Sequence, residues 1–257
     1  AAALTVAPAT VAPAITTQPL AQAVTAGGGV SFSVSATGTA PLSIHAFVVE
    51  SAGMRILVDT CVGDRAVPGL DGMRGDPAFL DRMVAAGFPP ESIDIVCCTH
   101  LHFDHVGWNT RWDGASWVPT FTSARYLFCR TEYDGWMAET NPFASNLPDT
   151  VAPVIDAGLA DLVDADHRIT DEVRFVPTHG HSPGHVSVHI SSGGAEALIT
   201  GDMTHPPVQW AETDWGFIGD WNGPMGAATR RRVIDEHADR GTLVLGTHYP
   251  SPTAGRI

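Results

Sequence analysis

The sequence predicts an α/β fold of the mixed α+β kind, an αββα sandwich with a short β-rich segment before it. In such a sandwich two β-sheets pack face to face, and helices cover both outer faces. Apolar runs rich in β-branched residues recur along the chain and indicate buried strands. Helical patterns recur between these runs, as expected when helices cover sheets. Several runs end in loops rich in histidine and aspartate, which places polar side chains at the edge of a sheet.

The first 40 residues differ in composition from the rest of the chain. They consist mainly of Ala, Val, Thr, Pro and Gly and contain no charged residue. They resemble the opening strands of bacterial immunoglobulin-like repeats, but such a sandwich needs roughly 100 residues, and the resemblance ends after two strands. We therefore treat residues 1–40 as an N-terminal segment and residues 41–257 as the main domain. Residues 30–35 alternate strictly, and we expect them to pair with the first sheet. For residues 1–20 a Pro-rich tail is an equal alternative.

The main domain is expected to begin with a β-hairpin. Two apolar runs, residues 44–50 and 55–60, are joined by a short turn. A helix over residues 77–86 has proline near its first position and Gly87 as its stop. The remaining expected elements are, in order, strands 93–99 and 125–129, a helix at about 150–159, strands 172–177, 185–190 and 195–200, a helix at about 224–239 and strand 242–246.

The composition limits the classes of partner. The net charge is −14 with a pI of about 5.1, which disfavours nucleic acids and anionic membrane surfaces. All 14 basic residues are arginine, so lysine Schiff-base chemistry is excluded. No apolar run approaches the roughly 18 residues of a transmembrane helix. We expect a soluble protein and leave open a cytoplasmic, periplasmic or secreted location and a homodimer.

The four cysteines give no sign of a metal or redox site. They lie at positions 61, 97, 98 and 129 and form no CxxC pattern. Cys97 and Cys98 are adjacent in an expected strand, so their side chains face opposite sides, and we expect both in the core. Disulfide bonds stay an open alternative.

The densest chemical signal is the stretch 98–107, Cys-Thr-His-Leu-His-Phe-Asp-His-Val-Gly. His100 and His102 lie two residues apart at the end of the expected strand 93–99 and are spaced to bind one ion. Asp104 and His105 begin a helix from which they can reach a second ion. Imidazole and carboxylate are the ligands that zinc and related metals prefer. Three histidines and one aspartate within six residues therefore predict a metal site, against the alternative of a polar loop.

These residues also carry a family resemblance. Residues 99–105, Thr-His-Leu-His-Phe-Asp-His, resemble the HxHxDH signature of the metallo-β-lactamase superfamily. Further motifs follow in the order typical of that superfamily: Thr178-His-Gly-His-Ser-Pro-Gly-His185, Thr200-Gly-Asp202 and Gly246-Thr-His248. The resemblance covers the chain from about residue 44 onward and implies the αββα fold for residues 41–257 as a catalytic domain.

The resemblance implies a dinuclear metal centre. His100, His102 and His181 would hold one ion, Asp104, His105 and His248 the other, and Asp202 would bridge them. The two divalent ions would be zinc, with iron, manganese or cobalt as alternatives. They would share a hydroxide that acts as the nucleophile, and the two aspartates Asp104 and Asp202 would be catalytic. Asp59, in the superfamily's early Asp-Thr pair, and His185 would support the ligands from behind.

Four further side chains are candidate substrate contacts: Trp108, His205, Trp210 and Tyr249. Trp108 directly follows the histidine motif, although a core position is an equal alternative. For His205 a structural or surface position is favoured over a place in the pocket. Trp210 belongs to a tryptophan-rich loop, residues 207–222, that suggests an apolar, aromatic-lined pocket.

The motifs predict a metal-dependent hydrolase of esters or lactones. Asp202 occupies the position where familiar zinc β-lactamases have Cys or Ser, so the resemblance favours the acyl-homoserine lactonase and methyl-parathion hydrolase branches. An organophosphate triesterase on the same centre is the alternative. β-Lactam hydrolysis is less favoured, and a non-catalytic, metal-clipped binding module is least favoured. A serine hydrolase is rejected, although residues 180–184 match GxSxG, because Pro183 after Ser182 has no N–H for an oxyanion hole.

Overall fold

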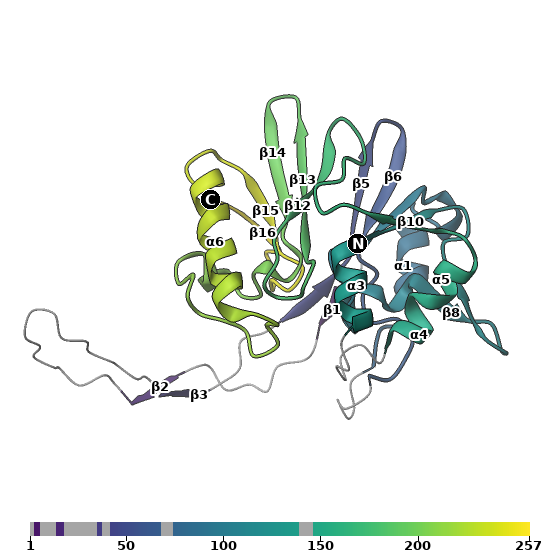
Figure 1. Ribbon diagram of the computed structural model, residues 1–257, viewed down its shortest axis with the longest axis horizontal. Coiled ribbons are helices and arrows are strands. Elements are labelled where there is room, and N and C mark those ends of the chain that lie inside the picture. The colour runs from purple at the N-terminus through teal and green to yellow at the C-terminus, as the bar shows by residue number, and fades with distance from the viewer. Residues whose placement is uncertain (1–2, 6–13, 18–34, 38–41, 68–73, 139–145) are drawn as a thin grey trace, which may run out of the picture.

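The computed structural model describes residues 3–5, 14–17, 35–37, 42–67, 74–138 and 146–257. Two five-stranded sheets face each other at its centre, and helices lie outside them (Figure 1). Because the chain folds as helix, sheet, sheet and helix layers, the predicted αββα sandwich is confirmed. No helix in the described part of the chain is long and apolar enough to cross a membrane.

The first sheet is built from the first half of the main domain. Its strands, in spatial order, are β11 (Ala160–Val163), β10 (Arg125–Cys129), β7 (Ile95–Cys97), β6 (Met54–Val58) and β5 (Phe47–Ser51). Strands β6, β7, β10 and β11 run parallel, and only β5 is antiparallel to its neighbour. The carboxyl ends of β6, β7 and β10 therefore lie at one edge of the sheet.

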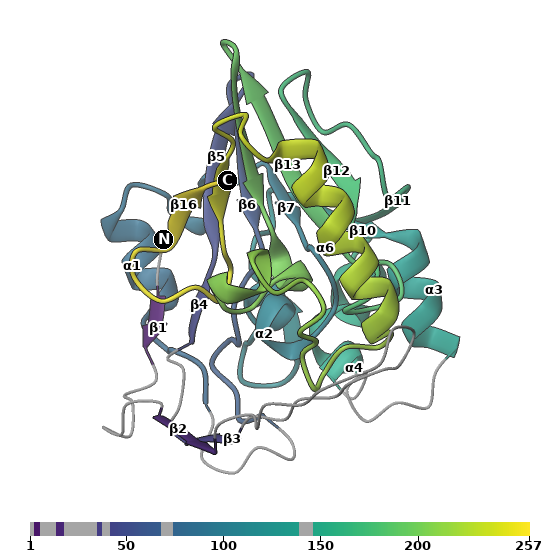
Figure 2. The ribbon, with the colours of Figure 1, turned by 90° about the vertical axis from the view of Figure 1, so that its left-hand side faces the viewer.

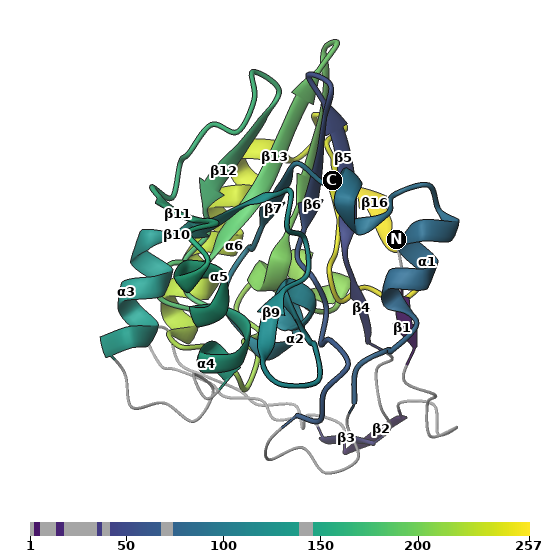
Figure 3. The same cartoon turned by 90° about the vertical axis from the view of Figure 1, so that its right-hand side faces the viewer.

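Helices cover the outer face of this sheet (Figure 3). They are α1 (Phe79–Ala85), α3 (Arg130–Ala138), α4 (Leu147–Thr150) and α5 (Ala152–Asp156), with the short α2 (Phe103–Val106) near the sheet edge. A small hairpin of β8 (Thr110–Trp112) and β9 (Trp117–Pro119) lies beside them.

The second sheet is built from the second half of the chain. Its strands, in spatial order, are β12 (Val173–Pro177), β13 (Val186–Ser192), β14 (Ala195–Ile199), β15 (Leu243–Leu245) and β16 (Ala254–Arg256). The long helix α6 (Gly223–His237) lies across its outer face (Figure 2). Strands β12, β14 and β15 run in the same direction, so the loops that follow them leave the sheet at one edge.

Alternation along the strands separates two apolar cores. Tyr126 and Phe128 of β10 belong to the core between the first sheet and its helices, whereas Leu127 and Cys129 belong to the core between the two sheets. Adjacent Cys97 and Cys98 divide between the cores in the same way, as the period of two requires. All four cysteines are buried and free of disulfide bonds. The core position predicted for Cys97 and Cys98 is confirmed.

Most expected elements are present, with shifted ends. The predicted strands 125–129, 172–177 and 195–200 correspond to β10, β12 and β14. The helix predicted at about 150–159 is instead two short helices, α4 and α5, which meet at Val151 with a φ of −116° and a ψ of −47°. The prediction missed α3, β11 and β16, whose residues show no clean period of two or 3.6.

Two short strand pairs include residues of the N-terminal segment. β1 (Ala3–Thr5) pairs antiparallel with β4 (Ser43–His45), and β2 (Ala14–Thr17) pairs antiparallel with β3 (Ser35–Thr37). The strand predicted over residues 30–35 lies, apart from Ser35, outside the described residues. β4 lies beside residues 247–248, because Ser43 N–H donates to the His248 carbonyl at 3.2 Å and His45 N–H to the Thr247 carbonyl at 3.1 Å.

Candidate metal centre

The seven predicted ligands come from four loops, and each loop follows the carboxyl end of a strand. The loop after β7 carries His100, His102, Asp104 and His105. The loops after β12, β14 and β15 carry one residue each, which are His181, Asp202 and His248. The fold brings the seven side chains together in two clusters whose donor atoms lie within 4.8 Å of one another: His100, His102, His181 and Asp202 in the first, and Asp104, His105 and His248 in the second.

In the first cluster, the ring nitrogens point at a common centre. His102 Nδ1 lies 2.9 Å from His100 Nε2 and 2.9 Å from His181 Nε2. The His181 Nε2 atom is also 3.3 Å from Asp202 Oδ2. The loops after β7 and β12 thus supply three imidazoles to one point, as the sequence predicted.

In the second cluster, two histidines face two carboxylates. His248 Nε2 lies 3.4 Å from Asp104 Oδ2, and His105 Nε2 lies 3.8 Å from the same oxygen. The Asp202 carboxylate completes this set, with its Oδ1 atom 3.0 Å from His105 Nε2 and 3.1 Å from His248 Nε2. Asp202 therefore contacts both clusters and lies between them.

The residues fit a pair of divalent ions. His105 Nε2 and Asp202 Oδ1 are buried and make no hydrogen bond in the described part of the chain, although 3.0 Å separates them. Buried polar atoms normally have hydrogen-bond partners, and an ion between these two atoms would satisfy both. A donor set of imidazole nitrogens and carboxylate oxygens suits zinc and its neighbours among the transition metals.

The charge states of the side chains in the first cluster agree with that fit. Burial lowers the pKa of His102 to about 4 and holds the pKa values of His100 and His181 well below the ordinary range. These imidazoles are therefore neutral, which is the state in which histidine binds a metal. Burial acts to raise the pKa of Asp202, but the surrounding histidines, His105 first, outweigh it and keep that pKa well below normal. Asp202 is therefore an anion.

Asp59 supports the loop after β7, as the family resemblance implied. Its Oδ1 atom accepts a hydrogen bond from the Thr99 N–H at 2.8 Å, and its Oδ2 atom lies 2.9 Å from His105 Nδ1. The carboxylate thus fixes the His105 ring with Nε2 turned toward Asp202. Asp59 is almost completely buried and has a φ of 59°, a left-handed conformation that aspartate and asparagine tolerate better than most residues.

His185 supports the loop after β14. Its Nε2 atom accepts a hydrogen bond from the Asp202 N–H at 2.9 Å, so its Nδ1 carries the proton and donates to Thr178 Oγ1 at 2.8 Å. Gly201, just before Asp202, has a φ of 54°, and a Cβ there would lie 2.6 Å from His185 Nε2. Only glycine allows this close approach. His185 thus contacts the backbone of Asp202 and is not itself a member of either cluster.

Two buried carboxylates at the site were missed by the sequence analysis. Glu132 accepts hydrogen bonds from the Leu101 N–H at 3.1 Å and the Gly184 N–H at 2.7 Å, so it ties the loop after β7 to the loop after β12. Ser182 Oγ donates to the same carboxylate at 2.7 Å. The hydroxyl that matched the GxSxG pattern is therefore committed to Glu132. No motif surrounds Glu132, and its position at the start of α3 appears only in three dimensions.

Asp220 is the second missed carboxylate. Its Oδ1 atom lies 3.0 Å from His181 Nδ1, which turns the ring so that Nε2 faces the first cluster. Its Oδ2 atom accepts a hydrogen bond from the Phe217 N–H at 2.9 Å. Asp220 lies in the tryptophan-rich loop, where the sequence analysis considered only the aromatic residues.

The candidate substrate contacts have different outcomes. Trp108 is buried and stacks on Phe79 with ring centroids 6.0 Å apart, so it fills the core, which was the alternative for this residue. Tyr249 is 4% exposed. Its hydroxyl accepts a hydrogen bond from Trp210 Nε1 at 2.5 Å and lies 2.6 Å from Thr204 Oγ1. The polar atoms of Trp210 and Tyr249 are thus bonded to each other, and their predicted contact with a substrate stays a prediction.

Of the surface and structural positions favoured for His205, the surface position is wrong. The side chain is buried, and its Nε2 atom lies 3.1 Å from Asp202 Oδ2. Its ring stacks on Phe217 with centroids 3.9 Å apart and lies parallel to the His248 ring at 5.1 Å. His205 forms a further cluster with Asp202 and His248, so it belongs to the metal centre.

The chain is similar in sequence to curated N-acyl homoserine lactonases. The chain is 25% identical to the N-acyl homoserine lactonase AiiA of Bacillus thuringiensis subsp. kurstaki over 178 residues, which are 64% of this chain and 65% of that protein. It is 26% identical to the N-acyl homoserine lactonase AttM of Agrobacterium fabrum (strain C58 / ATCC 33970) over 181 residues, 70% of this chain and 66% of that protein. The chain thus spans about 65% of the length of the curated relatives that it matches.

Solved structures show the same fold. AidC, a dizinc quorum-quenching lactonase, aligns with a TM-score of 0.70 and 23% identity, over 84% of this chain and 76% of AidC. The hydrolase AbOPH aligns with a TM-score of 0.71 and 24% identity, over 84% and 75%. The sequence matches the profile of the metallo-beta-lactamase superfamily over residues 39–236, more than half of the chain. The chain therefore belongs to the metallo-beta-lactamase superfamily.

Proposed function

We propose that this protein is a metal-dependent hydrolase that cleaves lactones or esters at a dinuclear centre. The observation that carries the proposal is the position of Asp202, whose two oxygens contact His105 and His248 on one side and His181 on the other. A purely structural zinc site is closed by four ligands around one ion. Seven donors in two overlapping clusters suit two ions with coordination positions left for water and substrate.

His100, His102 and His181 would hold one ion, Asp104, His105 and His248 the other, and Asp202 would contact both. When bound, two such ions activate a water molecule at neutral pH and polarise the oxygen of a carbonyl group. The side chain of Asp104 is 13% exposed, whereas that of Asp202 is 4% exposed. Asp104 is thus the carboxylate nearer to solvent, and we assign to it the orientation of water and the transfer of a proton to the leaving oxygen.

The apolar loop beside the centre suggests an apolar substituent on the substrate. Trp215, Phe217, Ile218 and Trp221 are exposed in residues 206–222. Phe217 packs on His205 and lies 6.2 Å from His181, measured between ring centroids. An acyl chain that lies along these side chains would bury apolar surface on both partners. We also propose that His205, whose Nε2 atom faces Asp202, forms a hydrogen bond with a substrate oxygen.

N-acyl homoserine lactones fit these features as a substrate class. They combine a neutral lactone ring with an apolar acyl chain, and the relatives AiiA and AttM are named as lactonases of this class. The net charge of −14 also favours neutral substrates over anionic ones. Neutral organophosphate triesters meet the charge criterion too and stay the alternative, although no contact at the centre favours them over lactones.

A rate panel on the zinc-reconstituted protein tests the proposal. It contains an N-acyl homoserine lactone, a p-nitrophenyl ester, paraoxon and nitrocefin, each measured with the wild type and with Asp202→Ala. We expect kcat/KM for the lactone or ester to exceed that for the other classes by about a hundredfold, or about 2.7 kcal/mol in transition-state binding. Faster turnover of paraoxon would establish the triesterase instead. Equally slow turnover of every substrate by both proteins would refute the hydrolase.

A further inference from the structure

A third group of metal-binding side chains lies outside the dinuclear centre. His189 is in β13, Glu196 in β14 and His237 in the last turn of α6, and one donor atom of each lies within 4.8 Å of the others. The two histidines lie 48 residues apart, and no motif in the sequence connects them. They meet because α6 packs against the outer face of the second sheet (Figure 2). We propose that His189, Glu196 and His237 bind one further divalent transition-metal ion, with zinc as the reference metal.

The pairing of the strands explains how the three side chains meet. Ser191 of β13 lies opposite Glu196 of β14, so these two side chains point to the same face. His189 lies two residues before Ser191 and therefore shares that face. The same face is covered by α6, since Leu198, which lies opposite His189, packs with Val233 of the helix. His237, one helical turn after Val233, completes the group.

The distances suit ligands of an ion better than hydrogen bonds. His189 Nε2 lies 3.9 Å from Glu196 Oε1, and His237 Nδ1 lies 3.8 Å from Glu196 Oε2. Both distances are too long for hydrogen bonds, whose N···O separation is about 2.7–3.2 Å. Ligand atoms at about 2.1 Å from a tetrahedral zinc are roughly 3.3 Å apart. A shortening of each of these two histidine–glutamate distances by about half an ångström would therefore match a zinc site, and the three donor atoms already lie within 4.8 Å of one another.

Both histidines are buried beside Glu196. The Nδ1 atom of His237 lies 3.2 Å from Thr242 Oγ1, and an ion bound at Nδ1 would replace this contact. The His189 ring makes no hydrogen bond to any other residue in the described part of the chain. Burial, and then the charge of Arg174, lower the pKa of His189, so its ring is neutral at pH 7.

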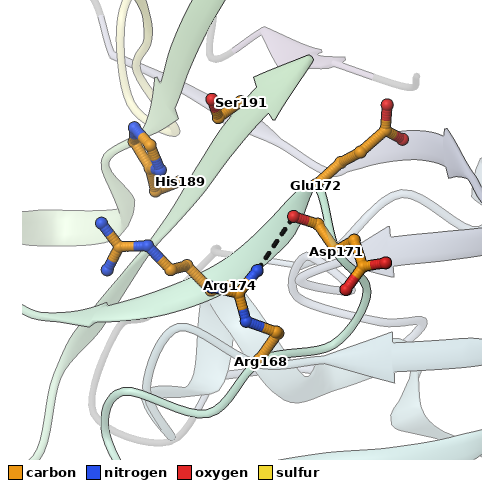
Figure 4. Close-up of a pocket in the computed structure, with 6 residues that line it drawn as sticks. All are labelled: Arg168, Asp171, Glu172, Arg174, His189 and Ser191. Carbon is orange, nitrogen blue, oxygen red and sulfur yellow. Dashed lines mark hydrogen bonds between the residues drawn. The ribbon is translucent and has the colours of Figure 1, made fainter.

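Solvent reaches the group from two sides. His189 lines a pocket of about 240 Å³ with Arg168, Asp171, Glu172, Arg174 and Ser191. Figure 4 shows His189 and Arg174 on one side of this pocket and Asp171 and Glu172 on the other. Glu196 lines a neighbouring pocket of about 490 Å³, and its side chain is 41% exposed. The three ligands can thus leave a coordination position for water. Arg174 repels a cation, so we expect weaker binding than at the dinuclear centre.

The group is well separated from the dinuclear centre. His189 follows His185 by four strand residues, a distance of about 13 Å. His237 lies at the opposite end of α6 from Gly223, about 21 Å along the helix axis. An ion here would join the end of α6 to the β13–β14 hairpin. It would therefore act on the stability of the second half of the domain without taking part in the reaction.

Equilibrium dialysis against buffered free zinc, followed by metal counting, tests the site. We expect the wild type to bind one ion more per chain than His189→Gln, Glu196→Gln or His237→Gln. Zinc above the amount that fills the dinuclear centre should also raise the melting temperature of the wild type by roughly 5 °C, and that rise should be absent from the three variants. His167→Gln and Glu236→Gln are matched controls outside the group and should retain the additional ion.

The outcome does not depend on the proposed hydrolysis, because the readout is a difference in bound zinc between variants. The proposal is overturned if the wild type and all three variants bind equal amounts of zinc. It is also overturned if the control variants lose the additional ion together with the others, which would indicate general surface binding. If no substrate of the panel is turned over but the wild type still binds one more zinc ion than the three variants, the proposed hydrolysis is refuted and the proposed third metal site is supported.

Discussion

The two halves of the main domain supply the metal centre in different ways. The first half gives four ligands from one loop, residues 100–105, and buried Asp59 and Glu132 hold that loop. The second half gives one ligand from each of three loops, and a different contact supports each one. His181 is held by Asp220, the Asp202 backbone by His185, and His248 Nδ1 by the Ser43 carbonyl at 2.9 Å.

This difference affects how each half tolerates change. In the first half one supporting carboxylate controls several ligands at once, because consecutive residues share one backbone. In the second half a defect at one loop leaves the other two loops in place. Asp202 is the exception, because it contacts ligands from both halves. We therefore expect effects to fall in the order Asp202, Asp59, Asp220 and Tyr249.

Asp202→Ala should have the largest effect. It removes the carboxylate that both clusters share, and we expect a loss in kcat/KM on the order of 10³-fold, the upper range for removal of one charge-stabilising group. Steady-state kinetics at saturating zinc measures the loss. Asp202→Asn is the isosteric control and should be nearly as inactive, because the lost charge is the cause. Near-normal turnover by either variant would contradict a shared role of Asp202.

Asp59→Asn should have the next largest effect. The amide cannot accept hydrogen bonds from both Thr99 N–H and His105 Nδ1–H, since one of its two positions is an NH₂ group. We expect zinc affinity to fall about 10- to 100-fold and the free energy of unfolding to fall by about 1–3 kcal/mol. Zinc competition and urea denaturation measure the two quantities.

A surface aspartate provides the control for that change. Asp161 pairs with Arg125 where both side chains are nearly half exposed. Asp161→Asn should cost less than about 1 kcal/mol and leave zinc affinity unchanged. If Asp59→Asn behaves like Asp161→Asn, the first half does not depend on its buried carboxylate.

Asp220→Asn should have a smaller effect, confined to one ligand. Only His181 loses its charged partner, so we expect zinc affinity at one of the two ions to fall about tenfold, the lower end of the range for such partners. Stepwise zinc titration distinguishes one weakened ion from two. Equal weakening of both ions would show that the loops of the second half are coupled.

Tyr249→Phe should affect stability more than rate. Its hydroxyl is bonded to Thr204 and Trp210, so its removal leaves buried polar groups unpaired, at a cost of about 1–3 kcal/mol. We expect kcat/KM to change by less than about threefold, or about 0.6 kcal/mol. A much larger loss of rate would support Tyr249 as a substrate contact.

The sequence could predict the first half of the site almost completely. His100 to His105 are contiguous, and a strand followed by a helix start fixes their relative positions. The ligands of the second half could be assigned only through the superfamily motifs, since nothing in local periodicity brings residues 181, 202 and 248 together. The fold class followed from alternating strand and helix patterns, but α3, β11 and β16 carry weak patterns and were missed.

The supporting contacts were less predictable. Asp59 and His185 were identified by resemblance, whereas Glu132 and Asp220 act across loops that are far apart in the chain. The hydrogen bond between Trp210 and Tyr249 was not predicted, because a buried hydroxyl and indole N–H bind each other as readily as they bind a ligand. The group of His189, Glu196 and His237 depends on the packing of α6 on the sheet, which no local pattern encodes.

Anomalous diffraction from crystals of the zinc-loaded protein would locate the ions of the metal centre. If both halves hold the centre, two zinc peaks should lie on either side of the Asp202 carboxylate, about 3.5–4 Å apart. One peak should be bound by His100, His102 and His181, and the other by Asp104, His105 and His248. A single peak at the centre, or ions bound by the residues of one half alone, would contradict the account.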